Sequence, residues 1–134
     1  LARLSGPLLD RMDIRIDVHT PSRADMAATK LRDSASIRER VIEARARARR
    51  RLEETPWSVN AQLPGAWLRH HSGIDTSLIT QLDRLVDSGN SSMRGVDRML
   101  RLSWTLADLD GAPRPTCEHI VTAQQLRNGA DQYE

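Results

Sequence analysis

The stretch that decides the fold is Ser91–Gly111, with the sequence SSMRGVDRMLRLSWTLADLDG. A serine at either of its first two positions can cap a helix, and the closing glycine is typical of a helix C-terminus. The apolar residues between them cover more than one face of such a helix: Val96, Met99, Leu100, Leu102, Leu106 and Leu109. Because so broad an apolar surface needs neighbours on several sides, we predict that this helix is the centre of a helical bundle.

Further helices are predicted on both sides of this central one. The capping box SIRE at Ser36–Glu39 begins a long helix that ends near Glu54. Its apolar residues fall on one face at helical spacing: Ile37, Val41, Ala44, Ala48 and Leu52. Three other helices are expected, one over residues 66–70, one from Asp75 or Thr76 to residues 88–90, and a last one capped by Thr116.

One strand is predicted ahead of the bundle. Residues 13–19, DIRIDVH, place Ile14, Ile16 and Val18 in alternation with polar residues, which is the period of a half-buried strand. A lone strand cannot form a sheet, so without its sheet we expect it to be disordered or paired with another copy. The expected fold class is mainly α: a small helical bundle preceded by one short orphan β-strand.

Composition narrows the class of protein. No apolar run approaches the roughly 20 residues of a membrane-spanning helix and no signal-peptide pattern occurs, so no membrane partner is expected. Cys117 is the single cysteine, which fits a cytoplasmic location, and we expect its side chain to be buried. The histidines have no metal-ligand spacing, and no metal site is predicted. No GxxxxGK[ST] loop occurs, so the chain by itself is not an NTPase.

The cationic residues are arginines, with Lys30 as the one exception. They are dense in the helix expected over residues 36–54, which allows two interpretations: a stripe that binds nucleic acid, or a solvated face paired with the glutamates of the same helix. Arg94 is unusual because it falls in the first turn of its helix. The macrodipole disfavours a cation there by a few tenths to about 1 kcal/mol, and a nearby phosphate would reverse that cost.

Five blocks resemble the magnesium-chelatase-related AAA+ ATPases (the YifB/ComM group). In order they are SGPLLDRMDIRIDV (5–18), IRERVIEARARARRR (37–51), NAQLPG (60–65), the stretch 91–111 quoted above and HIVTAQQLR (119–127). The resemblance covers nearly the whole chain. It implies the end of an AAA+ core with its last strand over residues 1–20, a linker over 21–33, a helical C-terminal lid domain over 34–128 and a tail over 129–134.

The resemblance also implies roles for two arginines. Arg11 matches an arginine finger that reaches the nucleotide held by the neighbouring subunit, with Asp10 and Asp13 able to orient it or to pair with it. Without the resemblance, a structural Arg–Asp pair at the start of the strand is the simpler interpretation. Arg94 matches a sensor-2 arginine that contacts an ATP phosphate, although SSMRG departs slightly from the commoner Leu-Ser-x-Arg form.

The implied whole is a ring of identical subunits, expected to be a hexamer, that acts on DNA as ComM-like helicases do. ATP and Mg would belong to the full-length protein, and no bound cofactor is expected on this part of it. Two alternatives stay open: the motor subunit of a true magnesium chelatase, and a stand-alone arginine-rich helical module that binds DNA.

Overall fold

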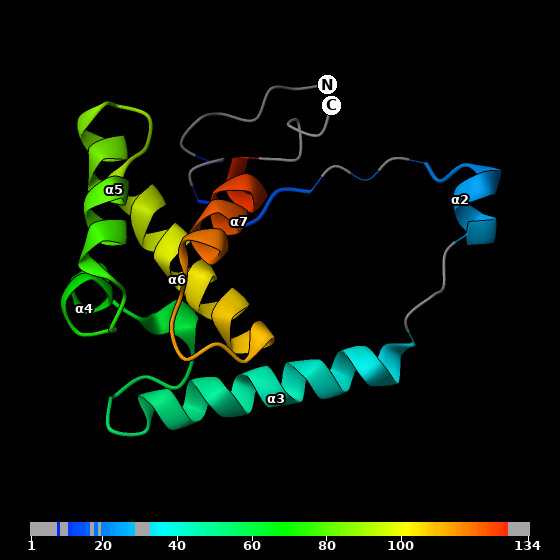
Figure 1. Ribbon diagram of the computed structural model, residues 1–134, viewed down its shortest axis with the longest axis horizontal. Coiled ribbons are helices and arrows are strands. Elements are labelled where there is room, and N and C mark those ends of the chain that lie inside the picture. The colour runs from blue at the N-terminus through cyan, green and yellow to red at the C-terminus, as the bar shows by residue number, and fades with distance from the viewer. Residues whose placement is uncertain (1–7, 9–10, 17, 19, 29–32, 129–134) are drawn as a thin grey trace.

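The computed structural model describes residues 8, 11–16, 18, 20–28 and 33–128 (Figure 1). Their secondary structure is helical, which confirms the expected mainly α class. The elements are α2 (Arg23–Ala28), α3 (Ser34–Leu52), the 3-10 turn η1 (Asn60–Gln62), α4 (Gly65–His70), α5 (Thr76–Asp87), α6 (Met93–Asp110) and α7 (Cys117–Asn128). None of the helices in the described ranges is both long and apolar enough to cross a membrane.

Helix α6 lies at the centre of the bundle, as its sequence predicts. It contacts α3, α4, α5, α7 and η1, and its neighbours surround it in Figure 1. Ser92 is the N-cap, because its hydroxyl accepts a hydrogen bond from the N–H of Gly95. Gly111 ends the helix with φ +70°, a left-handed conformation that a residue without a Cβ adopts at little cost.

The core forms where α6 meets the other elements. Val96, Leu100 and Trp104 of α6 are buried, and they belong to one apolar cluster with side chains from α3, α5, α7 and the segment between α3 and α5. At the edge of this cluster Trp57 meets Trp67 edge to face, with ring centroids 5.6 Å apart. A single continuous core holds the bundle together.

Helix α5 begins as predicted, with Asp75 as its N-cap. The carboxylate of Asp75 accepts a hydrogen bond from the N–H of Ser77 at 2.8 Å. Hydrogen bonds from the side chain and the backbone of Ser77 hold the pKa of Asp75 below its usual range. The cap therefore acts as a carboxylate at neutral pH.

Helix α3 begins earlier than predicted, because its N-cap lies three residues before Ser36, the cap of the predicted capping box. Its N-cap is Asp33, whose carboxylate accepts a hydrogen bond from the N–H of Ser36 at 2.7 Å, so Ser36 lies inside the helix. A carboxylate at this end is favoured by the helix dipole as well as by the hydrogen bond. Only the second half of the predicted apolar stripe is buried, by Ala44, Ala48 and Leu52. Ile37 is 49% exposed, because the first half of α3 extends beyond the bundle (Figure 1).

One expectation ahead of the bundle is corrected, and the extent of the linker stays a prediction. The described residues of the stretch 13–19 form no strand, and the rest of the described chain offers no strand for this stretch to pair with. Within the expected linker 21–33, Arg23–Ala28 form helix α2. The expected tail, residues 129–134, lies outside the described residues.

Cys117 is also a correction, because its side chain is exposed and not buried. It is the first residue of α7, and this position leaves the side chain outside the core that Ile120 and Ala123 enter.

Candidate functional site

Arg94 lies in the first turn of α6, as predicted, and its side chain is exposed. No acidic residue occupies that turn. Among the described residues Arg94 makes no hydrogen bond and no ion pair through its side chain. The first turn of α6 therefore carries a cation at the positive end of the helix dipole without a compensating carboxylate.

A second guanidinium approaches the same turn from α7. A Cβ added to Gly95 would lie 2.8 Å from Nη2 of Arg127, so a side chain at position 95 would displace the Arg127 tip. A cavity of about 570 Å³ opens beside this turn, lined by Leu85, Gly89, Asn90, Ser91, Ser92, Met99, Gln124, Arg127 and Asn128. The sequence indicated no role for Arg127, although this residue closes the last of the five blocks. The guanidinium groups of Arg94 and Arg127 therefore both lie at the N-terminus of α6.

Arg11 lies ahead of the bundle with its side chain exposed. Its backbone N–H donates to the carbonyl of Leu8 at 3.0 Å. In the described part of the chain its guanidinium makes no hydrogen bond or ion pair. Asp13, which the sequence suggested as a partner of Arg11, pairs with Arg98 of α6 instead. The other suggested partner, Asp10, lies outside the described residues.

The segment after Arg11 is fastened to the end of α7 by Arg15. The N–H of Arg15 donates to the carbonyl of Leu126 at 2.7 Å. Its guanidinium donates from Nε to the carbonyl of Arg127 at 2.8 Å and from Nη2 to that of Asn128 at 2.9 Å. These are carbonyls of the last turn of α7, which lack partners within the helix and carry the negative end of its dipole.

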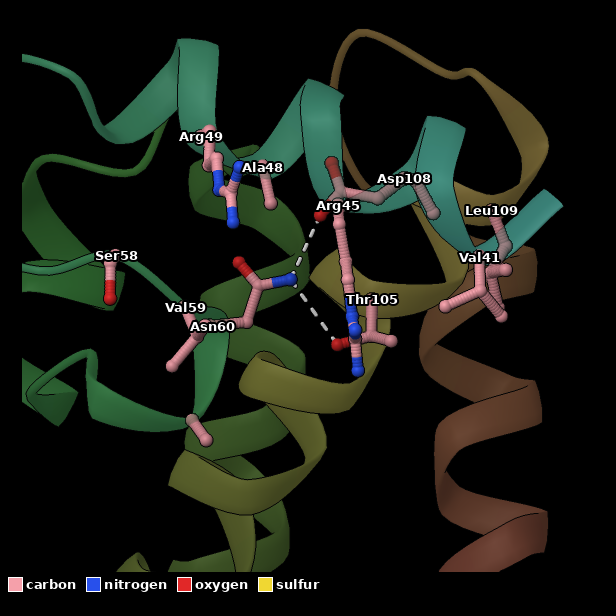
Figure 2. Close-up of a pocket in the computed structure, with 12 residues that line it drawn as sticks. Val41, Arg45, Ala48, Arg49, Ser58, Val59, Asn60, Thr105, Asp108 and Leu109 are labelled. Carbon is pink, nitrogen blue, oxygen red and sulfur yellow. Dashed lines mark hydrogen bonds between the residues drawn. The ribbon is translucent and has the colours of Figure 1, made fainter. Parts of the chain in front are cut away.

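A pocket of about 510 Å³ lies between α3, residues 58–61 and α6 (Figure 2). Asn60 stands at its centre, where its amide donates to the hydroxyl of Thr105 at 3.2 Å and to the carboxylate of Asp108 at 2.8 Å. Arg45 and Arg49 extend from α3 on either side of Asn60. In the described ranges neither guanidinium has a hydrogen-bond or ion-pair partner, so both remain available to an anion.

Other arginines of α3 are structural. Arg51 pairs with the carboxylate of buried Asp108 through both Nη atoms, and its guanidinium lies 3.7 Å from the ring centre of Trp104. It also donates to the Asn60 side chain at 2.6 Å, and Arg47 donates to the carbonyl of Asp108 at 2.8 Å. This network was not predicted from the sequence. Its one local signal is Asp108, an acidic residue among the apolar positions of α6.

No three His, Cys, Asp or Glu side chains of the described residues come close enough together to ligate one metal ion. His119 is buried and contacts Asp110 and Thr116, with 3.1 Å from its Nε2 to a carboxylate oxygen of Asp110. Guanidinium groups are numerous among the donors that the described surface offers to a ligand, and they suit phosphate and carboxylate oxygens.

Comparison with known proteins shows which sequence family this chain resembles. Residues 31–127 match the sequence family described as magnesium chelatase, subunit ChlI C-terminal. The chain is 35% identical over 127 residues to an uncharacterized protein of Mycobacterium tuberculosis. It is 32% identical over 130 residues to the uncharacterized protein YifB of Salmonella typhimurium, and 30% identical over 129 residues to the competence protein ComM of Haemophilus influenzae. Each alignment covers 95% of this chain and 25% of the relative, so the chain spans about a quarter of these curated proteins.

Proposed function

The chain belongs to the family of C-terminal domains of the magnesium chelatase subunit ChlI, and from that premise we propose that it is the lid and subunit-contact part of an AAA+ ATPase. In this proposal the full-length protein hydrolyses ATP in a ring of identical subunits, expected to be a hexamer. The chain contributes two arginines to the ATP sites. The ATP and Mg sites themselves belong to the remainder of the full-length protein.

The observation that carries the proposal is the first turn of α6. Arg94 is exposed there at the positive end of the dipole, and no acidic residue of that turn balances it. A phosphate oxygen beside this turn would interact favourably with the guanidinium and with the free N–H groups of the helix end. We assign Arg94 the sensor-2 role, in which it binds a phosphate of the ATP held by its own subunit.

Arg11 has the properties that an arginine finger needs. Its guanidinium is exposed, and no described residue holds it in an ion pair. Phosphoryl transfer builds negative charge on the oxygens of the transferred group, and a fixed guanidinium stabilises that charge. We assign Arg11 to the ATP of the neighbouring subunit.

The extended segment after Arg11 supports a larger assembly. Its apolar side chains are exposed to different extents: Ile14 is 45% exposed, Ile16 66% and Val18 89%. An apolar row of this kind is a surface that another part of the protein covers. We propose that the AAA+ core of the full-length protein covers it.

We propose DNA as the substrate of the motor. The support is the resemblance to the ComM group and the free guanidinium groups that α3 presents at Arg45 and Arg49. A magnesium chelatase motor subunit is the alternative, supported by the name of the family. ATP turnover by the full-length protein that rises with duplex DNA and not with a porphyrin supports the first, and the reverse supports the second.

The test of the two arginines uses the purified full-length protein. We expect Arg11→Ala and Arg94→Ala each to lower kcat for ATP hydrolysis severely, by about a thousandfold for the finger, with helical circular dichroism unchanged. Mixing the two inactive variants should restore part of the turnover. In a mixed ring, an Arg11→Ala subunit keeps its own Arg94 and receives Arg11 from an Arg94→Ala neighbour.

The matched control is Arg84→Ala, an exposed arginine of α5. It should leave turnover unchanged. Near-normal turnover in either test variant would remove that arginine from the proposal. Two inactive variants that stay inactive when mixed would contradict action between subunits.

A further inference from the structure

The extended segment that follows Arg11 is attached to the bundle by its polar side. Asp13 and Arg15 are two residues apart in a segment that forms no strand. Both contact the bundle, Asp13 through Arg98 of α6 and Arg15 through the last carbonyls of α7. Of the apolar residues beside them, Ile14 is 45% exposed and Ile16 is 66% exposed. The segment is therefore joined to the bundle at two polar residues, while apolar surface of the same segment stays exposed.

Arg98 has a specific need for Asp13. Its side chain is 19% exposed, and its buried Nε has no hydrogen-bond partner among the described residues. The carboxylate of Asp13 is the acidic group that pairs with this partly buried guanidinium. The Asp13 side chain is 66% exposed, so solvent weakens the pair in part, and removing Asp13 would leave the partly buried guanidinium of Arg98 without its carboxylate.

The attachment also limits where Arg11 can be. Asp13 is two residues from Arg11, so the backbone allows a separation of only about 7 Å between them. Through the chain itself, Arg11 reaches α3 only by way of residues 12–33, a connection that includes α2. The contacts of Asp13 and Arg15 are thus the nearest described attachments of Arg11 to the bundle.

Arg98, the partner of Asp13, lies close to Arg94 on α6. Arg94 and Arg98 are four residues apart on α6, so their side chains lie on one face of the helix, one turn from each other. A single helical turn and one ion pair therefore connect Arg94 with Asp13.

We propose that Arg98 and Arg15 are positioning residues that hold Arg11 in a fixed relation to α6 and Arg94. In this arrangement an ATP that binds Arg94 of one subunit shifts the Arg11 that the same subunit presents to its neighbour. The inference rests on the proposed function for the roles of Arg11 and Arg94. The attachment itself depends only on the described contacts.

The experiment compares four forms of the full-length protein: wild type, Arg98→Glu, Asp13→Arg and the double variant that exchanges the two charges. Hydrogen exchange of peptides around residue 15 reports the attachment, because the Arg15 N–H is bonded to Leu126. We expect exchange at this amide to accelerate at least tenfold in each single variant and to return toward the wild-type rate in the exchanged pair. Arg84→Glu is the control for charge reversal and should change nothing.

ATP turnover by the same proteins separates positioning from a general effect on structure. We expect Arg98→Glu to lower kcat at least tenfold with little change in KM, and the exchanged pair to recover most of it. Because Arg98 acts through Arg11, the variant Arg11→Ala/Arg98→Glu should be no slower than Arg11→Ala alone.

The outcomes are distinguishable. Normal turnover in Arg11→Ala contradicts the proposed function. A defective Arg11→Ala together with a normal Arg98→Glu overturns the positioning role and leaves the function in place. Additive losses in Arg11→Ala/Arg98→Glu, or unchanged exchange at the Arg15 amide in Arg98→Glu, also overturn it.

Discussion

The carboxylate of Asp108 is buried, and three parts of the fold meet at it. It accepts hydrogen bonds from Arg51 of α3 and from Asn60 of η1, and it belongs to α6. The guanidinium of Arg51 also lies over the ring of Trp104, so the ion pair is closed on one side by an apolar surface. One acidic residue thus fixes how α3 and η1 dock on the central helix.

Replacing Asp108 by Ala is expected to lower the free energy of unfolding by about 3 kcal/mol or more, because Arg51 would remain partly buried without its carboxylate. For a domain of this size the melting temperature should fall by roughly 10 °C. Thermal unfolding followed by circular dichroism measures both. Asp87→Ala, at an exposed aspartate of α5, is the control. Equal melting temperatures for the two variants would show that the network adds no stability.

Helix α3 is an element of two halves. Its second half packs on the bundle through Ala44, Ala48 and Leu52. Its first half extends past the bundle with Ile37 and Ile42 exposed, so its helical structure depends on local hydrogen bonds and on the cap at Asp33. The two halves should therefore respond differently to the same change.

Asp33→Ala tests this division. Loss of the cap costs about 1 kcal/mol, and we expect it to appear as faster hydrogen exchange in the first half of α3 with the melting temperature almost unchanged. Ser36→Ala removes only a hydroxyl that donates to the carbonyl of Asp33, and its effect should be smaller. A larger effect at Ser36 would restore the capping box as the start of the helix.

Across the whole molecule, the arginines divide into structural and available groups. Arg47 and Arg51 point into the fold, while Arg45, Arg49 and Arg50 carry no hydrogen bond or ion pair to a described side chain. The formal net charge is only +2, so nucleic-acid binding has to come from such a local cluster and not from the overall charge.

For the full-length protein we expect DNA binding that weakens steeply as salt rises. Neutralising Arg45, Arg49 and Arg50 together should lower the slope of log K against log salt by up to about three, because each arginine can neutralise one phosphate. A fluorescence anisotropy titration at several salt concentrations measures this slope, with Arg84→Ala as the control. An unchanged slope would exclude α3 from the DNA interface. Absence of binding at low salt would exclude the stand-alone DNA-binding module.

The sequence alone predicted those parts of the fold that depend on residues close together along the chain. Both ends of α6 were predictable because Ser92 and Gly111 act on the backbone within a few residues. The start of α3 was not, because Asp33 and Ser36 both fit the pattern of a cap and the carboxylate is the better acceptor at a helix N-terminus. The strand failed because its hydrogen bonds need a partner outside the segment.

The sequence could suggest which residues form the candidate site, but it could not predict their contacts. The roles that the resemblance implies for Arg11 and Arg94 stay predictions, and nothing local in the sequence indicates that Asp13 faces Arg98. That ion pair joins residues far apart along the chain, and so does the approach of Arg127 to Gly95. Such pairs follow from the packing of α6 against α7 and the extended segment, which no periodicity encodes.

The contacts of Arg51 limit which arginine-to-lysine substitutions this sequence can accept during evolution. Coding changes that exchange arginine for lysine alter little where a cation is merely solvated, as at Arg38 or Arg50. At Arg51 a flat, forked group grips a carboxylate with two nitrogens, reaches an amide and covers an indole at once, and a single ammonium cannot do so. A related sequence in which most arginines are replaced by lysine would therefore have to keep Arg51, or change the residues that Arg51 contacts as well.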